Sequence, residues 1–164
     1  MKIFGIMGYS GSGKTTLIEG LIKRFAARGL QVSLIKHAHH GFDIDRPGKD
    51  SFRHREAGAG EVMLLSDRRW VLMHEVGNEP PPQLEQMITR LSPCDLVLLE
   101  SFKTAAVDKL EVYRPSVGKA PIWPNCQGVV AVASDAQVDC PLPLLDLNDH
   151  DVVAEFVLKH VGLD

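Results

Sequence analysis

Short apolar runs alternate with amphipathic segments along the chain, and this pattern predicts strands and helices in a regular order. The run Lys2–Met7 stops at Gly8 and is typical of a buried parallel strand. Apolar residues then recur at helical spacing over Thr15–Arg28, and Gln31–Ile35 is a second strand-like run. Strand, glycine-rich turn, helix and strand in this order form the βαβ unit of a doubly wound sheet.

The later segments continue this alternation. Further helices are expected over about Asp50–Ala59, Gln83–Leu91 and Asp149–Val161. Asp50 is a suitable cap for the first of them. The runs Glu61–Ser66 and Trp70–Val76 are separated by a short polar turn and predict a hairpin. Further strands are expected at Leu96–Leu99, Lys109–Arg114, Gly128–Ala133 and Leu144–Leu147.

The turn after the first strand carries the strongest chemical signal. Gly8–Thr15 reads GYSGSGKT and matches GxxxxGK[ST], a loop whose backbone N–H groups and following helix attract phosphate. Lys14 should reach the β- and γ-phosphates, and the Thr15 hydroxyl should bind Mg²⁺. The expected nucleotide contacts are Gly8, Ser10, Gly11, Ser12, Gly13, Lys14, Thr15 and Thr16. We predict one P-loop nucleotide-binding domain over residues 1–164: an α/β fold with a doubly wound, mostly parallel sheet, helices on both faces and an added β-hairpin.

Phosphoryl chemistry also requires a carboxylate near the metal ion. Glu100 follows the apolar run Leu96–Leu99, and the C-terminal ends of parallel strands form the ligand crevice of such a sheet. We therefore expect Glu100 to hold Mg²⁺ through water or to orient the attacking water. With Lys14, it is the predicted catalytic pair.

The segment Ile35–Ala59 is unusually rich in histidine, aspartate and basic residues. His37, His39 and His40 are candidate contacts for a second, anionic ligand, or alternatively for a metal ion. Asp43 and Asp45 share a side if the chain is extended and could reach the nucleotide's Mg²⁺. A solvated polar loop without a ligand remains the other interpretation.

Composition narrows the functional class. The formal net charge of −3 argues against binding nucleic acid through general basicity, and no apolar run is long enough to cross a membrane. The N-terminus goes directly into a strand rather than a signal peptide, so a cytoplasmic protein is expected. Three cysteines without CxxC spacing argue against a disulfide framework or structural zinc.

Several of these segments together resemble one family. The phosphate loop, IKHAHHGFDIDRPGKDS with RHREAGA, LVLLESFK, VVAVASD and LLDLND are similar to the molybdopterin-guanine dinucleotide biosynthesis protein B family, MobB. The resemblance covers nearly the whole chain, and the His-Asp loop is far more specific than the phosphate loop. The usual glycine after the strand-end glutamate is Ser101 here, which puts the backbone role of that position in doubt.

The resemblance implies a GTP-binding protein with weak, Mg²⁺-dependent GTPase activity. It further implies an accessory role beside the guanylyltransferase that attaches GMP to molybdopterin, with molybdopterin or the molybdenum cofactor as a second ligand. Family members form dimers through extended sheets. The bulky residues of the predicted hairpin, which are poorly suited to a solvated edge, also favour a homodimer.

The sequence leaves two questions open: which residue recognises the base, and which reaction the protein supports. Asp135 stands where a guanine-specific motif would lie, and its carboxylate could accept from guanine N1–H and N2–H₂, although aspartate is also common in turns. A small-molecule kinase on the same scaffold, with Asp43 or Asp45 as base, is one alternative. A nucleotide-switched metal-delivery protein that uses the histidines is another.

Overall fold

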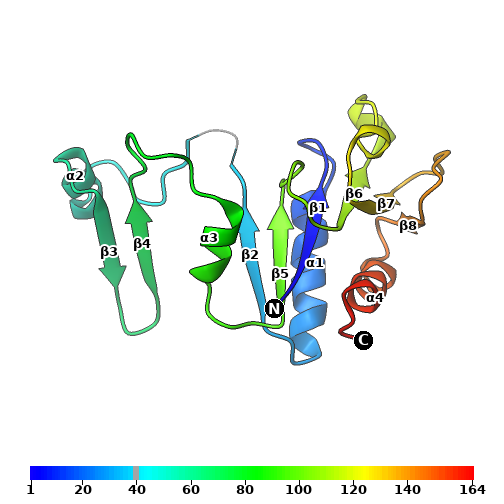
Figure 1. Cartoon of the computed structure of the whole chain (residues 1–164), viewed down its shortest axis with the longest axis horizontal. Coiled ribbons are helices and arrows are strands. Elements are labelled where there is room, and N and C mark those ends of the chain that lie inside the picture. Colours follow the sequence, from blue (N-terminus) through cyan, green and yellow to red (C-terminus); the bar gives the residue numbers. More distant parts are fainter. Residues whose placement is uncertain (39–40) are drawn as a thin grey trace. The chain divides into compact units, whose positions relative to one another are not determined.

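The computed structural model describes residues 1–38 and 41–164, so the predicted site residues His39 and His40 lie outside the described part. The chain divides into two compact units, each with its own sheet (Figure 1). The first unit comprises Met1–His37 and Arg90–Asp164, and the second comprises Ala38–Thr89. The expected single nucleotide-binding domain over residues 1–164 stays a prediction.

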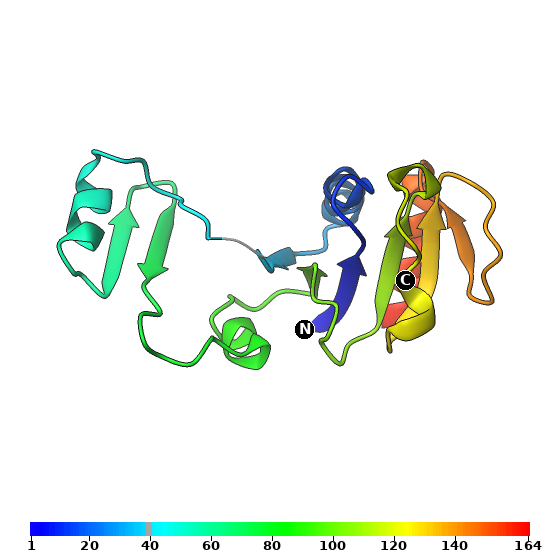
Figure 2. The ribbon, with the colours of Figure 1, turned by 90° about the horizontal axis from the view of Figure 1, so that it is seen from above.

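A six-stranded sheet forms the framework of the first unit. Its order is β2-β5-β1-β6-β7-β8, and every neighbouring pair is parallel (Figure 2). The strands are β1 (Lys2–Met7), β2 (Val32–Lys36), β5 (Leu96–Glu100), β6 (Lys109–Tyr113), β7 (Val129–Ser134) and β8 (Leu144–Asp146). All six runs predicted from the sequence are strands, within one residue of the expected bounds. Their shared direction brings all C-terminal ends to one edge of the sheet.

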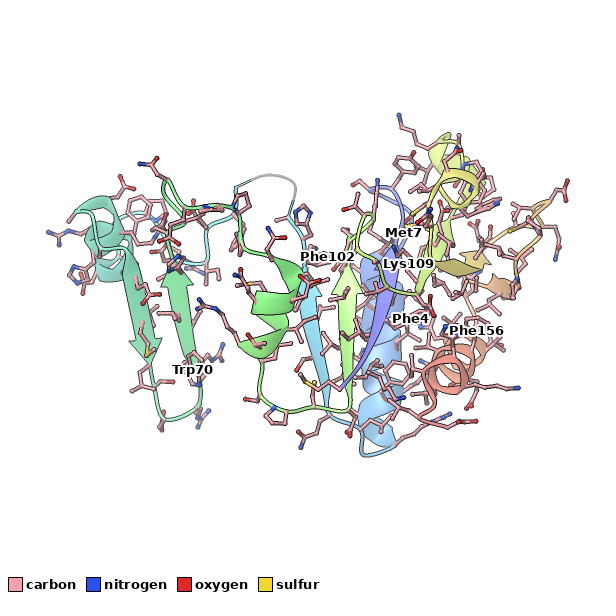
Figure 3. The ribbon with its side chains drawn as sticks, in the orientation of Figure 1. Phe4, Met7, Trp70, Phe102, Lys109 and Phe156 are labelled. Carbon is pink, nitrogen blue, oxygen red and sulfur yellow. The ribbon has the colours of Figure 1, made fainter. Side chains whose placement is uncertain are left out.

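Two helices, α1 (Lys14–Ala27) and α4 (His150–Val161), pack against each other and against β1. Apolar side chains at helical spacing supply the contact, and Phe25 at the end of α1 is fully buried. Figure 3 shows Phe4 on β1 and Phe156 on α4, both of which contact the His160 ring. Full burial of a phenylalanine side chain such as Phe4 or Phe25 stabilises the fold by about 1.5–3 kcal/mol.

The start of α4 agrees with the sequence. The Asp149 carboxylate accepts from the N–H groups of Asp151 and Val152, each at 3.1 Å, so two N–H groups of the first turn have a partner. Within the described part of the chain, no helix has the length and apolar character to span a membrane.

The opposite face of β6 carries two buried charges. Leu110 and Val112 join the apolar core, so Lys109 and Glu111 point to the other side, where both are nearly inaccessible. Lys109 Nζ donates to the carbonyl oxygens of Lys103, Ala105 and Gln127. The Glu111 carboxylate accepts from the N–H groups of Ile122 and Trp123. Two loops that cover this face are thereby held by charge-assisted bonds, without which either buried charge would be costly.

The second unit contains the predicted hairpin. Its elements are α2 (Asp50–Glu56), β3 (Glu61–Leu65), β4 (Trp70–His74) and α3 (Leu84–Thr89). The two strands are antiparallel, and Leu65 faces Trp70 while Met63 faces Leu72. These four residues share one face, on which Met63, Leu65 and Trp70 are exposed by 58%, 78% and 64%.

The ends of α2 differ from the prediction. Lys49, not Asp50, is the N-terminal cap, and Asp50 is the first helical residue, where its charge still favours the helix N-terminus. The helix ends at Glu56 instead of about Ala59 because Gly58 takes a left-handed conformation, with φ of 101°.

Candidate functional site

The phosphate loop joins β1 to α1 at the C-terminal edge of the parallel sheet. Gly11 and Gly13 have φ of 81° and 98°, values that favour glycine. A Cβ at Gly8 would collide with the Val112 carbonyl oxygen on the neighbouring strand, so this position also requires glycine. Helix α1 begins directly after Gly13, and no side chain in the described part of the protein caps it. The backbone thus presents a helix N-terminus, as anion binding requires.

Two polar side chains lie within this loop. Ser12 is 2% exposed, and its hydroxyl has no hydrogen-bond partner among the residues that the structure describes. Lys14 Nζ donates to the Tyr9 carbonyl oxygen at 2.8 Å, which holds the ammonium group inside the loop. Burial lowers the pKa of Lys14, and Lys103 and Lys36 lower it further, while Glu100 opposes them. An orphaned buried hydroxyl beside a partly desolvated ammonium group suits a phosphate ligand.

The remaining predicted loop residues are more open. Ser10, Gly11, Thr15 and Thr16 are exposed. Thr15 and Thr16 lie in the first turn of α1, next to Lys14. Their hydroxyls are therefore accessible to a ligand and to a metal ion that the ligand brings, which is the environment expected for Thr15.

Glu100 occupies the end of β5, next to the phosphate loop. It is paired in register with Ile6 of β1 and with Lys36 of β2. The carboxylate is 6% exposed and lies 3.3 Å from Lys36 Nζ, whose side chain is 57% exposed. The structure thus places Glu100 and Lys14 at one edge of the sheet, close enough for the carboxylate to act on the pKa of the lysine.

His37 follows β2 at the same edge. Its N–H donates to the Glu100 carbonyl oxygen at 3.0 Å, and its ring centroid is 5.4 Å from that of Phe102. His37 is therefore the described member of the histidine cluster that lies beside the strand-end carboxylate, whereas His39 and His40 lie outside the described residues.

Ser101, directly after Glu100, has φ of 70° and is the only non-glycine residue with positive φ in the described part of the chain. Its N–H donates to the Ile6 carbonyl oxygen at 3.0 Å, which ties this turn to β1. The backbone therefore needs a conformation that glycine adopts without strain, and the serine Cβ makes it unfavourable. Ser101, which replaces the glycine expected from the family, therefore stands where the backbone favours glycine.

Asp135, the predicted base-reading residue, has a partner that the sequence did not suggest. Its Oδ2 lies 3.3 Å from Nη1 of Arg114, the residue that follows β6. Arg114 Nε also donates to the Ser12 carbonyl oxygen at 3.4 Å. Because arginine is common on protein surfaces, the sequence alone did not single out Arg114. The pairing of β6 with β7 is what brings Arg114 next to Asp135.

A second cation was also missed. Lys103 Nζ lies 4.8 Å from the centroid of the Tyr9 ring in the phosphate loop, a distance typical of a cation–π contact. The motif ESFK that contains Lys103 was noticed, but it carried no sign of where this side chain would lie.

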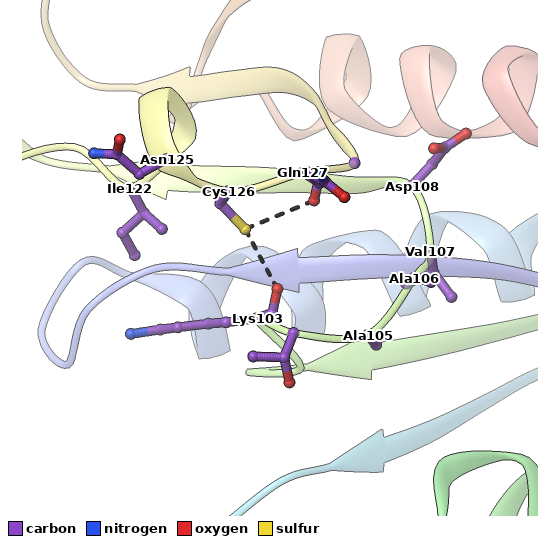
Figure 4. Close-up of a pocket in the computed structure, with 11 residues that line it drawn as sticks. Lys103, Ala105, Ala106, Val107, Asp108, Ile122, Asn125, Cys126 and Gln127 are labelled. Carbon is purple, nitrogen blue, oxygen red and sulfur yellow. Dashed lines mark hydrogen bonds between the residues drawn. The ribbon is translucent and has the colours of Figure 1, made fainter.

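Lys103 also lines a pocket of about 530 Å³, whose wall is formed by residues 103–108, 122 and 125–128. Figure 4 shows Cys126 at its centre, where the thiol contacts the carbonyl oxygens of Lys103 and Gln127. The pocket wall therefore helps to fix the segment that carries Lys103.

Asp43 and Asp45 belong to the second unit and share a partner there. Arg55 Nη2 lies 3.0 Å from Asp43 and 2.9 Å from Asp45, and Nη1 lies 2.8 Å from Glu75. The Asp45 side chain is 2% exposed. The hydrogen bonds of Arg55 to Asp45 and then to Glu75 raise the pKa of Arg55. Both aspartates thus have a structural role within their unit, and their proposed contact with Mg²⁺ stays a prediction. Among the described residues there is no group of three or more His, Cys, Asp or Glu suited to a metal ion.

Comparison with known proteins extends these observations. The family model of molybdopterin guanine dinucleotide synthesis protein B, MobB, matches residues 3–135. A molybdopterin-guanine dinucleotide biosynthesis adapter protein of Escherichia coli is 39% identical over 162 residues, which cover 97% of this chain and 93% of that protein. Its counterpart in Haemophilus influenzae is 40% identical, over 96% of this chain and 88% of the other.

Solved structures give the same fold. A crystal structure of molybdopterin-guanine biosynthesis protein B matches with a TM-score of 0.76 and 28% identity, over 96% of this chain and 99% of the other. Bacillus subtilis MobB matches with a TM-score of 0.78 over 98% of both chains, at 23% identity. The predicted α/β fold class is therefore confirmed. The family match and the near full-length similarity show that this chain belongs to the MobB family.

Proposed function

We propose that the first unit binds GTP at the phosphate loop, with Mg²⁺, and that the chain acts as an accessory protein in molybdopterin guanine dinucleotide formation. The observation that carries the nucleotide part is the loop itself. Glycines at left-handed φ, an uncapped helix start, the buried Ser12 hydroxyl and the Lys14 ammonium group converge on one place. Each of these groups favours a phosphate.

Hydrolysis by this site should be slow. Thr15 and Glu100 would hold Mg²⁺, which supplies charge neutralisation on the phosphates. The Glu100 carboxylate already forms an ion pair with Lys36 at 3.3 Å. It would therefore have to bind Mg²⁺ or orient water while it remains paired with this lysine. A carboxylate in that position would orient water weakly compared with a dedicated base, and we therefore expect the GTPase activity to be weak.

The pathway role rests on family membership. The relatives from Escherichia coli and Haemophilus influenzae are molybdopterin-guanine dinucleotide biosynthesis adapter proteins. We propose that this chain likewise assists a molybdenum cofactor guanylyltransferase in the cytoplasm, with molybdopterin or the molybdenum cofactor as second ligand. His37, His39 and His40 are the proposed contacts for that ligand, since five Lys or Arg accompany the histidines between Lys36 and Arg55 and would attract a phosphate.

We also propose a homodimer formed through the hairpin. The hairpin face that carries Met63, Leu65 and Trp70 exposes large apolar side chains, and solvated hairpins rarely do so. A second copy offers the same apolar face and unpaired strand edges, so a two-fold contact would be self-complementary.

Titration calorimetry with a non-hydrolysable GTP analogue and Mg²⁺ tests the nucleotide proposal, and co-purification with the guanylyltransferase and molybdopterin tests the pathway role. Saturable binding of the analogue together with retention of the partner supports both. A chain that binds no nucleotide would refute the first proposal. Nucleoside diphosphate formed only with an added acceptor, together with the phosphorylated acceptor and no free phosphate, would favour the kinase alternative. Stoichiometric transition metal in untagged protein would favour metal delivery.

A further inference from the structure

Arg114 lies between two parts of the proposed nucleotide site. Strand β6 pairs with β1 on one side and with β7 on the other, so its C-terminal end lies between the phosphate loop and Ser134–Asp135. Arg114 is the first residue after β6, and Pro115 then starts a short 3-10 helix. The backbone at this position is therefore fixed on both sides.

The guanidinium group contacts both the phosphate loop and Asp135. Nε donates to the Ser12 carbonyl oxygen at 3.4 Å, and Nη1 lies 3.3 Å from Asp135 Oδ2. Nη2 approaches Gly13 so closely that a Cβ there would be 3.4 Å away. One planar group thus contacts the phosphate loop and the carboxylate at the end of β7.

An arginine is suited to this task for geometric reasons. Its donors lie in a rigid plane and point in several fixed directions, whereas a lysine presents one compact charge that serves both partners poorly. The ion pair also restricts the rotation of the Asp135 carboxylate. Each carboxylate oxygen has two lone pairs, so Oδ2 can accept from Arg114 and still accept from a ligand.

We propose that Arg114 is a positioning residue that aligns Asp135 for the N1–H and N2–H₂ donors of guanine and links this base contact to the phosphate loop. The inference rests on the proposed function, because it assumes that GTP binds in the first unit. Arg114 then determines purine selectivity without touching the base. Arg114 would instead affect all nucleotides equally if it contacted phosphate.

The test measures the affinities of GTP, ATP and inorganic tripolyphosphate for Arg114→Ala, Arg114→Lys and Asp135→Asn by calorimetry. Lys119→Ala is the matched control, since it removes an exposed positive charge from the same segment. We expect Arg114→Ala to weaken GTP about tenfold while ATP and tripolyphosphate change little, because an aligned charge-assisted contact is lost. Arg114→Lys should lie between wild type and Arg114→Ala, and Lys119→Ala should match wild type.

The double variant Arg114→Ala with Asp135→Asn should prefer GTP no less than Asp135→Asn alone, because the two residues act through one contact. An unchanged GTP-to-ATP ratio in Arg114→Ala and Arg114→Lys, or equal weakening of all three ligands, would overturn the inference and leave the proposed function standing. A wild-type protein that binds neither nucleotide would instead overturn the proposed function, and this inference with it.

Discussion

Replacing Ser101 by glycine should stabilise the protein. Ser101 has φ of 70°, and its N–H is fixed to the Ile6 carbonyl oxygen at 3.0 Å, so the turn cannot relax without losing that bond. A left-handed conformation costs a residue with a Cβ about 1–2 kcal/mol. Glycine removes this cost but adds about 0.4–1 kcal/mol of conformational entropy to the unfolded chain.

These two ranges leave a net gain in the free energy of unfolding of about 0–1.6 kcal/mol for Ser101→Gly, with a central value of about 0.8 kcal/mol. For a chain of this length, the midpoint of thermal unfolding should rise by about 1–4 °C. Ser101→Ala is the matched control, because it removes the same hydroxyl but keeps the Cβ that causes the strain. Calorimetry or circular dichroism on the three proteins measures the effect.

The comparison between the two variants decides the argument. If strain at φ is the cause, glycine must be more stable than alanine, and alanine must be no more stable than serine. A glycine variant that unfolds at or below the midpoint of the alanine variant would refute the reasoning. Since Ser101 follows Glu100, GTP hydrolysis by Ser101→Gly would also show whether the strained turn sets the position of the carboxylate.

Four further changes have expected outcomes. Lys14→Ala should weaken binding of a GTP analogue about tenfold or more in calorimetry and leave the unfolding midpoint nearly unchanged, since the ammonium group faces the loop and not the core. Glu100→Gln should retain binding but slow phosphate release about tenfold or more, and an unaffected rate would shift the role to Asp43 or Asp45. Leu65→Lys should convert a homodimer to a monomer in light scattering, and wild-type monomer at micromolar concentration would refute the dimer. Asp149→Ala should cost about 1 kcal/mol in chemical denaturation, because two N–H groups of α4 lose their acceptor.

Local patterns in the sequence were sufficient for most of the fold. Parallel strands that are buried on both faces appear as continuous apolar runs, so the strand Leu96–Glu100 was recognisable. The spacing of glycine, lysine and threonine identified the phosphate loop without knowledge of any contact with a distant segment. The end of α2 was less predictable, because it depends on whether Ala57, Gly58 or Gly60 leaves the helical conformation first. Helix ends fray, so the last residues of a helix are the least predictable part of it.

Contacts between distant segments could not be read in the same way. Arg114 and Ser12 are separated by 102 positions, and their contact depends on β6 pairing beside β1. The alternation of Lys109 and Glu111 predicted a strand, but a charged residue at every second position usually indicates a solvated face. The structure buries both charges instead, because loops from either side supply their hydrogen-bond partners. No pattern within the strand itself contains that information.

Several cations gather at the C-terminal edge of the sheet, although the whole chain carries a net charge of −3. Lys36 and Lys103 both act on the pKa of Lys14 there, and Lys36 and Arg114 are paired with the carboxylates of Glu100 and Asp135. Like charges gathered in this way raise the free energy of the protein, and burial already lowers the pKa of Lys14. A nucleoside triphosphate with Mg²⁺ carries about two negative charges and would reduce the repulsion among these cations. The same electrostatic cost that opposes folding therefore favours nucleotide binding, and the pairs Lys36–Glu100 and Arg114–Asp135 reduce that cost in the free protein.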